Sequence, residues 1–412
     1  MNILAKIIPF KAIRPTRDKA QLVTSRPYYA YTNLMLQAKL KGNPYSFIHI
    51  INPEFSEDDK TEPNTPERFQ KVRNRFDDFF EEGIFIQEEK ASLYIYKKTT
   101  QQHTYIGVIG GASIEEYNNG HIKKHEQTLT ERETVFSNYL KVVEFNAEPV
   151  LLFHDNREKL NQLLTKLTFE RPEYEFTTTD KAKHELWVIS NENILKEIQE
   201  LYADIEDVYI ADGHHRAASS ALYYEQADEK TEIKKHFLAY FISSEKLNIL
   251  DYNRLIKGLN NLTINELLDK ISVNFIITEV KEENPKTRGQ HNILMYVDKK
   301  WYNLQAKEKI INRNHPVESL DTYILSHFIL KPILGVKSLK TDKRVGFVNG
   351  RKGMKGLKEI VNNQDYDVAF GLSHVTPKQL KDVADANLIM PPKSTWIEPK
   401  LRSAMVIYPL ND

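Results

Sequence analysis

The sequence contains no cysteine. This absence excludes disulfide bonds, thiolate nucleophiles, iron–sulfur clusters and cysteine-ligated zinc. Any metal ion that the protein holds must therefore be bound through oxygen atoms or imidazole nitrogens.

The chain also lacks a surplus of either charge and any long apolar run. Its 57 lysines and arginines balance 57 aspartates and glutamates, so charge alone favours neither nucleic acid nor an anionic membrane as a partner. No stretch approaches the roughly 20 apolar residues of a membrane span. The first residues, MNILAKIIPF, lack the apolar run of about 7–15 residues that a secretory signal needs. We therefore expect a cytoplasmic protein without a membrane partner.

The hydrophobic pattern predicts a mixed α/β (α+β) fold. A length of 412 residues with 41% hydrophobic composition favours two or three domains with buried cores. Short apolar or alternating segments are interspersed with segments of helical periodicity. We expect one part over residues 1–245 that is rich in candidate site residues, and a mixed α/β part over residues 246–412 that closes the site, with residues 390–408 returning to it.

The same pattern predicts individual elements. Strands are expected at residues 4–13, 92–96, 105–109, 149–153, 182–189, 208–211 and 404–408, and helices at residues 68–80, 130–145, 194–202 and 216–226. Residues 46–51 alternate as in a strand, where His49 is as well explained by a hydrogen bond as by a site. Residues 281–290 are expected to form a charged loop or hairpin, and residues 344–354 a glycine-rich hairpin.

One segment places a strand, a polar turn and a helix in immediate succession; the turn is Asp212-Gly213-His214-His215-Arg216. A helix N-terminus directs backbone N–H groups and the positive end of its dipole at a bound anion. Gly213 permits close approach of the backbone, and Arg216 offers two parallel donors to a phosphate. His214 and His215 donate or accept hydrogen bonds, and Asp212 could ligate Mg²⁺ or orient a histidine.

A simpler interpretation makes Asp212 the N-cap of this helix and leaves Arg216 on its surface. A cap accounts for the aspartate. It does not account for two consecutive histidines and an arginine on a turn followed by small residues, so we favour phosphate binding.

Six motifs spread along the chain belong to one known pattern. They are Pro9-Phe10-Lys11-Ala12 with Arg14-Pro15, Arg26-Pro27-Tyr28, Asn43-Pro44-Tyr45-Ser46-Phe47, His121-Ile-Lys-Lys-His-Glu126 with Thr128, Ala211-Asp-Gly-His-His-Arg216, and MPPKSTWIEPKLR at residues 390–402. In these motifs the chain resembles, from end to end, the family catalogued as domain of unknown function 1015. The name of that family implies no chemistry.

A second resemblance is confined to short motifs. The strand, Asp-Gly-His-His-Arg turn and helix are similar to the phosphate-binding turn of the ParB/sulfiredoxin-like fold, which includes the free-serine kinases. Pro9 with Arg14-Pro15 is similar to the opening strand of that fold. The resemblance implies a nucleotide-binding core in the N-terminal part and transfer of phosphate from a nucleotide to the hydroxyl group of serine.

Residues 121–128 supply the groups that such a transfer requires. Cations neutralise the migrating phosphoryl group, and a carboxylate orients or deprotonates the attacking hydroxyl. Lys123 and Lys124 are the cations here, and Glu126 is the first choice of general base. A charge cluster before a helix is commonly just a solvated surface, but the family resemblance favours a site.

A metal could bind to the histidines of this segment. His121 and His125 are four residues apart and could share an ion, with His214 or His215, if the segment is helical. Gly120 and the absence of a His-Glu-x-x-His motif count against a zinc hydrolase. The expected metal is instead the Mg²⁺ of a nucleotide-dependent phosphotransferase, with Asp212 and Glu126 as its expected ligands.

The C-terminal motif, residues 391–402, is rigid and basic. Its three prolines restrict the backbone, so Lys393, Lys400 and Arg402 are presented with little loss of entropy. The alternative is a structural crossover that leads into a core strand. We expect one of the three cations to share a bound phosphate, or the carboxylate of the acceptor, with Arg216.

The leading interpretation is a nucleotide-dependent phosphotransferase on a small hydroxylated metabolite, with free L-serine and phosphoserine as the specific expectation. ATP or ADP and Mg²⁺ are the expected cofactors. The expected catalytic residues are Glu126, Asp212 and His215, and the expected nucleotide-binding residues are Gly213, His214, Arg216, Lys123, Lys124, Arg14, Lys393, Lys400 and Arg402.

Two other classes stay open. One is a ParB-like, nucleotide-operated DNA-binding protein, although the balanced charge and the lack of a recognisable DNA-reading helix disfavour nucleic acid. The other is a sensor that binds a phosphate ligand without turning it over. The residues leave the donor, the direction of transfer and the oligomeric state open.

Overall fold

The computed structural model describes residues 6–55, 57–281, 289–363 and 365–411. The chain divides into two compact units. The first comprises Met1–Leu247 with Pro399–Asp412, and the second is Asn248–Glu398. The C-terminal motif is thus split, because residues 390–398 belong to the second unit and residues 399–402 to the first. The predicted functional domains, residues 1–245 and 246–412, stay a prediction.

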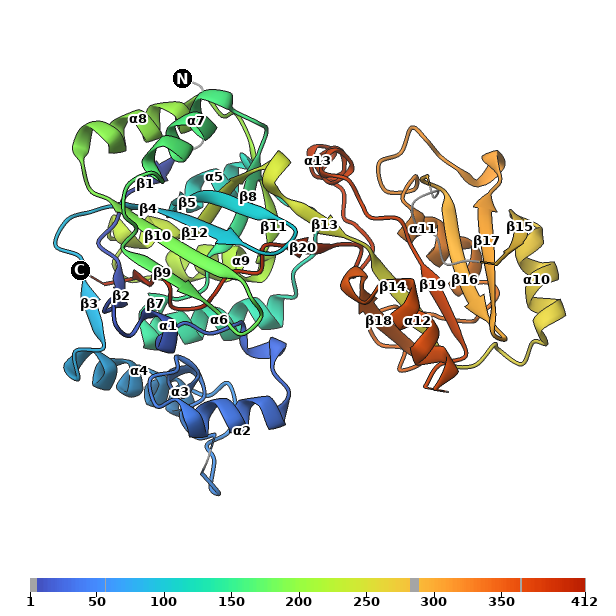
Figure 1. Cartoon of the computed structure of the whole chain (residues 1–412), viewed down its shortest axis with the longest axis horizontal. Coiled ribbons are helices and arrows are strands. Elements are labelled where there is room, and N and C mark those ends of the chain that lie inside the picture. The colour runs from blue at the N-terminus through green and yellow to red at the C-terminus, as the bar shows by residue number, and fades with distance from the viewer. Residues whose placement is uncertain (1–5, 56, 282–288, 364, 412) are drawn as a thin grey trace. The chain divides into compact units, whose positions relative to one another are not determined.

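A nine-stranded mixed sheet forms the centre of the first unit (Figure 1). Its order is β6 (Ile122–Lys123), β11 (Val208–Asp212), β8 (Val150–His154), β12 (His236–Ser243), β5 (Thr104–Ser113), β4 (Leu93–Thr99), β10 (Lys183–Ile189) and β9 (Tyr174–Thr177), and β1 (Ile7–Ile8) also pairs with β5. The pairs β6–β11 and β8–β12 are parallel, and the others are antiparallel. Mixed pairing of this kind confirms the predicted α/β class.

The helices of the first unit pack in two groups. One group contributes to the core formed with the sheet: α5 (Ile114–Asn119), α7 (Glu158–Leu167), α8 (Glu192–Ala203) and α9 (His214–Glu225). The other group forms two further apolar clusters with short strands: α1 (Ala20–Val23), α2 (Asn33–Gly42), α3 (Ile48–Ile51), α4 (Pro66–Glu81), α6 (Thr130–Val143), β2 (Ile13–Pro15), β3 (Phe85–Gln87) and β7 (Phe145–Asn146). The short strand β21 (Tyr408–Pro409) pairs with β7. Amphipathic periodicity explains which face of a helix is buried. Helix α8, for example, buries Leu195, Ile198 and Tyr202 at helical spacing.

The second unit has its own six-stranded antiparallel sheet. Its order is β15 (Phe275–Val280), β17 (Lys300–Ala306), β16 (Asn292–Val297), β19 (Val368–Gly371), β14 (Tyr252–Ile256) and β18 (Val345–Asn349). The helices are α10 (Ile264–Ser272), α11 (Asp321–Leu325), α12 (Gly353–Asn362) and α13 (Pro377–Asp385), and β13 (Asn248–Leu250) pairs with β20 (Trp396–Glu398). Separate apolar cores stabilise the two units.

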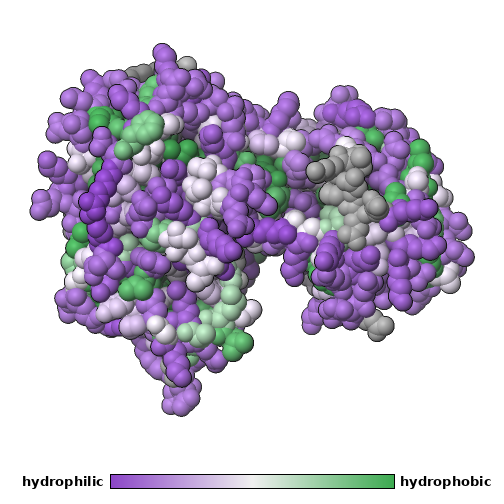
Figure 2. Space-filling model, in the orientation of Figure 1, coloured by the Kyte–Doolittle hydropathy of each residue, from purple (hydrophilic) through white to green (hydrophobic). Residues whose placement is uncertain are grey.

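The surface shown in Figure 2 is mainly hydrophilic, with hydrophobic residues in small separate groups. Exposed large apolar side chains are few and include Phe169 and the adjacent pair Leu34 and Met35, as is normal for a globular protein. Within the part of the chain that is described, none of the helices has both the length and the apolar character that a bilayer span requires.

Most predicted helices and strands are confirmed within a few residues, but four are not. The strand expected at residues 404–408 shrinks to Tyr408–Pro409, because Ala404 adopts a φ of 59°, which breaks an extended chain. The expected hairpin at residues 344–354 is β18 followed by α12, and His49 lies in α3 rather than in a strand. The expected strand at residues 4–13 is interrupted between β1 and β2. Its first residues, and most of the expected loop at residues 281–290, lie outside the described residues.

Candidate functional site

The parallel pair β6–β11 sets the position of the candidate site. Ile122 lies opposite Val208, and Lys123 lies opposite Tyr209. Because the two strands run in the same direction, the residues that follow them emerge at the same edge of the sheet. Residues 124–126 and residues 213–216 are therefore neighbours, although they are far apart in the sequence.

Gly213 forms the turn between β11 and α9. Its φ of 99° lies in the left-handed region, and it is the N-cap of α9. The first intrahelical hydrogen bond runs from the amide of Ala217 to the carbonyl of Gly213, at 3.0 Å. The alternative in which Asp212 caps the helix is therefore wrong, because Asp212 is the last residue of β11. Buried small residues, including Ala217 and Ala218, allow the start of α9 to pack closely on the sheet.

Two cations flank the carboxylate of Asp212. The guanidinium of Arg216 donates to Asp212 Oδ2 at 3.2 Å and also to the carbonyl of Pro149. Lys400 Nζ lies 3.3 Å from Asp212 Oδ1. Burial would raise the pKa of Asp212, but the charges of Lys400 and Arg216 lower it below its usual value. Asp212 is therefore an ionised carboxylate held between two positive groups.

A small pocket opens beside this group. It is lined by Pro27, Glu148, Pro149, Leu151, Asp212, Arg216, Pro399, Lys400, Leu401 and Arg402. The enclosed volume is about 20 Å³, which holds about one water molecule. A phosphate group would enter only if Lys400 or Arg216 moved away from Asp212. The cationic side chains that line the pocket suit an anion, but the pocket is too small to hold a phosphate in this conformation.

Gly213→Ala should disturb this pocket. The substitution forces a side chain into a left-handed backbone at a cost of about 1–2 kcal/mol. Its Cβ would also lie 2.9 Å from Cζ and Nη2 of Arg216 and so would displace the guanidinium. Chemical unfolding and ATP titration measure the two effects.

Gly120→Ala is the matched control, because Gly120 has a φ of 84° but open space around the added Cβ. Both variants should lose similar stability, and only Gly213→Ala should also weaken ATP binding. Equal ATP affinity in the two variants would contradict a role of the Arg216 guanidinium in ATP binding.

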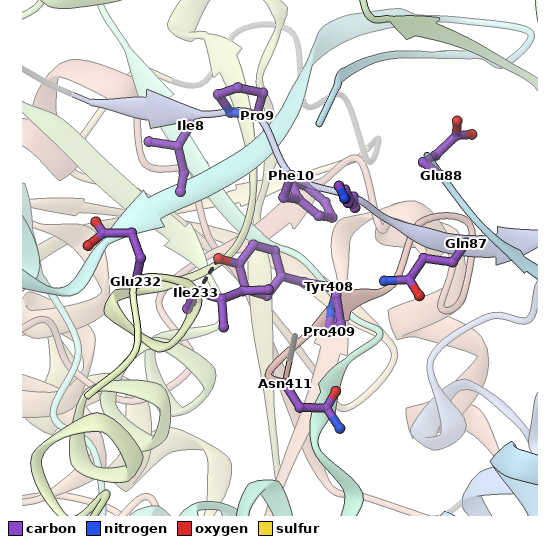
Figure 3. A pocket seen from close by; sticks show the side chains of 11 residues that line it. Ile8, Pro9, Phe10, Gln87, Glu88, Glu232, Ile233, Tyr408, Pro409 and Asn411 are labelled. Carbon is purple, nitrogen blue, oxygen red and sulfur yellow. Dashed lines mark hydrogen bonds between the residues drawn. The ribbon is translucent and has the colours of Figure 1, made fainter. Parts of the chain in front are cut away.

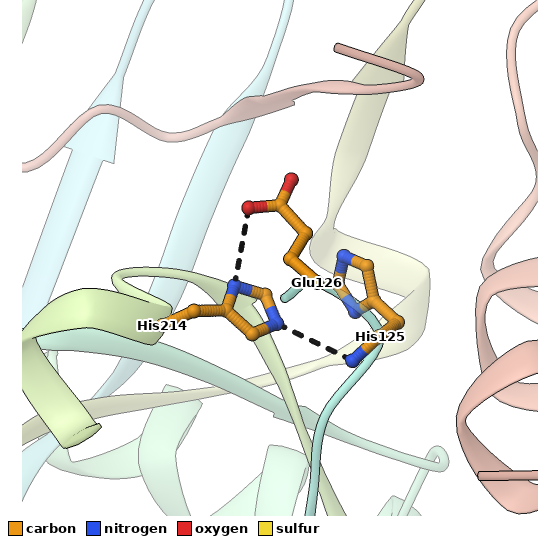
Figure 4. Close-up of side chains that lie close together, drawn as sticks. All are labelled: His125, Glu126 and His214. Carbon is orange, nitrogen blue, oxygen red and sulfur yellow. Dashed lines mark hydrogen bonds and ion pairs between the residues drawn. The ribbon is translucent and has the colours of Figure 1, made fainter. Parts of the chain in front are cut away.

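A second group, His125, Glu126 and His214, lies at the same edge (Figure 4). The Nδ1 atom of His214 is 3.6 Å from Oε2 of Glu126, and the backbone N–H of His125 donates to Nε2 of His214 at 3.4 Å. The two imidazole rings meet edge to face with centroids 4.4 Å apart. Since Nε2 of His214 accepts a hydrogen bond, a neutral His214 carries its proton on Nδ1, facing Glu126.

Both histidines are buried, and burial changes their ionisation. Burial lowers the pKa of His125 to about 3, with His214 adding to the effect. Burial also lowers the pKa of His214 to about 3, despite the opposing charge of Asp212. Both imidazoles are therefore neutral at pH 7, and the glutamate beside them is the exposed member of the group.

The residues present do not fit a Mg²⁺ ion shared by Asp212 and Glu126. Mg²⁺ prefers an octahedral set of oxygen ligands. Each carboxylate oxygen of Asp212 already faces a cation, and Glu126 lies beside imidazole nitrogens.

The other predicted site residues are placed as follows. Lys123 Nζ lies 2.7 Å from Asp207, and Lys124 Nζ lies 4.5 Å from the centre of the Tyr117 ring. His215 follows His214 at the start of α9 and is half-buried. Arg402 lines the small pocket and donates to the carbonyl of Thr24 at 3.1 Å. The roles predicted for these residues stay predictions.

Two predicted residues have other surroundings. The guanidinium of Arg14 contacts Glu88, Glu173 and the hydroxyl of Tyr174, which together satisfy much of its charge. Lys393 belongs to the second unit, where its Nζ lies 5.7 Å from the centre of the Tyr252 ring. The structure thus brings together Asp212, Arg216, Lys400 and Arg402 but not Arg14.

An ion shared by His121 and His125 was expected only if their segment is helical. The residues between them include β6, and His121 Nδ1 lies 3.4 Å from Asp207. Glu148 and Pro27 of the small pocket were also missed as site residues. The sequence signal for His125 was its position directly before Glu126.

A larger cavity of about 570 Å³ lies elsewhere in the first unit (Figure 3). It is lined by Ile8, Pro9, Phe10, Lys11, Gln87, Glu88, Glu232, Ile233, Tyr408, Pro409 and Asn411. The hydroxyl of Tyr408 donates to the carbonyl of Ile233 at 2.8 Å. Among the residues described, none of those predicted for catalysis or nucleotide binding lines this cavity, so its volume does not bear on the site at Asp212.

Comparison with solved structures gives distant similarities. A free serine kinase in complex with AMP is 13% identical, covers 72% of this chain and 92% of its own, and gives a TM-score of 0.37. C-terminally truncated SbnI from Staphylococcus aureus is 11% identical, covers 73% and 87% of the two chains, and gives a TM-score of 0.40. A conserved hypothetical protein from Pyrococcus furiosus is 13% identical, covers 70% and 90%, and gives a TM-score of 0.35.

No curated protein matches the chain in sequence. A family model does match, over residues 7–323, and its description is "Protein of unknown function (DUF1015)". That span includes the motifs at Pro9, Arg26, Asn43, His121 and Ala211 that carry the resemblance. Since the match covers most of the sequence, the chain belongs to the DUF1015 family.

Proposed function

We propose that this protein is a nucleotide-dependent phosphotransferase that acts on the hydroxyl group of a small metabolite, with free L-serine and phosphoserine as the reacting pair. The observation that carries the proposal is the position of Arg216 and Lys400 on either side of the Asp212 carboxylate, directly before the N-cap of α9. A phosphate is stabilised by the same kinds of group: guanidinium, ammonium and the amides of a first helical turn.

Asp212 compensates the two cations when no phosphate is bound. A terminal nucleotide phosphate carries up to two negative charges, so it can replace the carboxylate between Arg216 and Lys400. Arg402 lines the same pocket and adds a third cation. Binding by replacement explains how a closed pocket with a volume of about one water molecule could accept a phosphate.

Glu126 is the residue that we assign to the acceptor hydroxyl. Its side chain is 48% exposed, next to the start of α9, so a substrate has access to it. Asp212 is less suited to accept a proton, because the flanking cations lower its pKa. In the proposed step the hydroxyl proton passes to Glu126, the hydroxyl oxygen bonds to the terminal phosphorus, and the bridging oxygen of the nucleotide leaves with the electron pair.

Radiolabelled nucleotide separates this function from its alternatives. The protein is incubated with γ-labelled ATP or β-labelled ADP and a panel containing L-serine, L-threonine and glycerol, and products are resolved by chromatography. Labelled phosphoserine is the expected result. The reverse reaction is tested with phosphoserine and the corresponding unlabelled nucleotide product, since the physiological direction is part of the question.

Three outcomes contradict the proposal in different ways. Saturable nucleotide binding without a phosphorylated product indicates a sensor. Salt-sensitive retention of duplex DNA without transfer indicates a ParB-like DNA-binding protein. Transfer to glycerol but not to serine retains the phosphotransferase and overturns the assigned acceptor.

A further inference from the structure

His125, Glu126 and His214 have the donor set of a transition-metal site. One nitrogen or oxygen from each residue lies within 4.8 Å of the other two. At a tetrahedral ion with bonds of about 2.0–2.1 Å, ligand atoms are roughly 3.4 Å apart. The 3.6 Å separation of His214 Nδ1 and Glu126 Oε2 is already close to that value. Figure 4 shows the three side chains close together.

The ring of His125 provides an independent observation. The residue is 1% exposed, and neither ring nitrogen has a hydrogen-bond partner among the residues that the structure describes. Buried polar groups are normally paired, because water is lost on burial without compensation. The unpaired nitrogens of His125 lie beside a carboxylate and a second imidazole, which is the environment that a metal ligand requires.

The charge of the group also suits a cation. Both imidazole rings are buried, and a neutral imidazole offers a nitrogen lone pair to a metal ion. Glu126 supplies a carboxylate whose side chain is 48% exposed, which gives an ion a path from solvent. Three protein ligands leave a coordination position open, as in catalytic rather than structural metal sites.

We propose that His125, Glu126 and His214 bind a divalent transition-metal ion of the Zn²⁺ and Co²⁺ class in preference to Mg²⁺. Two imidazoles and one carboxylate suit such an ion, whereas Mg²⁺ requires oxygen ligands. This site depends only on the three side chains and not on the proposed phosphotransferase activity. This assignment takes the place of the Mg²⁺ site that was expected at Asp212 and Glu126, because those two residues do not fit Mg²⁺.

Binding has a defined consequence for His214. A metal ion on Nδ1 requires the ring proton to move to Nε2, which now accepts the amide of His125. That contact is 3.4 Å long, and it should open when the ion binds. Glu126 can ligate through one oxygen and leave the other to accept a hydrogen bond, so metal binding is compatible with its assignment to the acceptor hydroxyl.

Cobalt titration of the full chain tests the site in the absence of nucleotide. The visible absorption of Co²⁺ reports imidazole ligation, and competition with Zn²⁺ and then Mg²⁺ reports selectivity. We expect one Co²⁺ per chain, displaced by Zn²⁺ and not by a large excess of Mg²⁺. Because no nucleotide or acceptor is present, failure of this experiment says nothing about phosphotransfer, and failure of phosphotransfer says nothing about the metal.

Substitutions of Glu126 and His125 test whether these residues bind the Co²⁺ ion. Glu126→Gln and His125→Gln should each weaken Co²⁺ binding by at least about 10- to 100-fold. Glu126 is the decisive position, since its exposed side chain can be changed with little effect on folding, while thermal unfolding checks the His125 variant. His121→Gln is the matched control, because His121 is nearby and lies 3.4 Å from Asp207 instead. Undiminished binding in Glu126→Gln, absence of stoichiometric binding in the wild type, or equal displacement by Mg²⁺ would overturn the proposal.

Discussion

Replacement of Glu126 by glutamine is expected to lower the turnover of phosphoryl transfer by about 10²–10⁴-fold while nucleotide affinity changes little. Glutamine keeps the size of the side chain but accepts no proton from the serine hydroxyl. The carboxylate is exposed and lies outside the pocket formed by Asp212, Arg216 and Lys400, so nucleotide contacts should be preserved. Steady-state kinetics with separate variation of serine and nucleotide measures both effects.

Glu131→Gln is the control for loss of a nearby negative charge. Glu131 lies in the first turn of α6 with an exposed side chain, and its replacement should leave turnover within about twofold, as is usual for substitutions at exposed positions. Near-normal turnover in Glu126→Gln would move the base elsewhere, with Asp212 next. A loss confined to nucleotide affinity would place Glu126 in nucleotide binding.

Glu126→Gln also distinguishes a general base from a metal ligand. Turnover is measured in protein treated with a chelator and in protein saturated with Zn²⁺. A direct contact of Glu126 with the hydroxyl predicts a loss in both preparations. A role limited to holding the metal predicts a loss only in the Zn²⁺-saturated protein, and that result would contradict the base assignment while supporting the metal site.

The turn at Gly213 was predictable because its signals are local. An apolar strand, a glycine and a run of small residues adjoin one another, and each dictates a conformation over a few residues. Long amphipathic helices such as α4 and α8 were predictable for the same reason, since periodicity marks both the element and its buried face.

The neighbourhood of His125 and His214 was not predictable from local signals. It depends on the parallel pairing of β6 with β11, and β6 has two residues, too few for any periodic pattern. Hydrophobic pattern identifies which residues are buried in a strand, but it does not identify the partner strand. The condition for an ion shared by His121 and His125, a helical segment, is not met, because β6 lies between them.

A position of Lys393, Lys400 or Arg402 near Arg216 was predicted from charge, although the path of the chain was not. A phosphate and an anionic acceptor require more than one cation, which favoured a contribution from the C-terminal motif. Sequence gave no sign that the motif divides at Pro399 between two units or that Ala404 adopts a positive φ. Both features depend on tertiary packing rather than on the residues themselves.

Arg216→Ala should weaken nucleotide binding by about 10- to 150-fold, the effect of losing a charge-assisted, two-donor contact to phosphate. Arg216→Lys should also be impaired, because an ammonium group cannot reproduce the planar fork that now reaches both Asp212 and the carbonyl of Pro149. Isothermal titration with ATP and ADP measures the affinity, and chemical unfolding verifies that the variants fold. Unchanged affinity in a folded Arg216→Ala protein would contradict the phosphate-clamp assignment.

A double-mutant cycle with Lys400 tests whether the two cations share one phosphate. Both flank the same carboxylate, at 3.2 Å and 3.3 Å, so a phosphate that replaces Asp212 should contact both. Residues that act on one group are coupled, and we expect a coupling free energy of about 0.5–3 kcal/mol in ATP binding between Arg216→Ala and Lys400→Ala. Lys196→Ala, at an exposed position on α8, should show no coupling with Arg216→Ala. Strict additivity of the two losses in ATP-binding free energy would mean that Arg216 and Lys400 do not contact the same phosphate. Lys400 would then be assigned to the carboxylate of the acceptor.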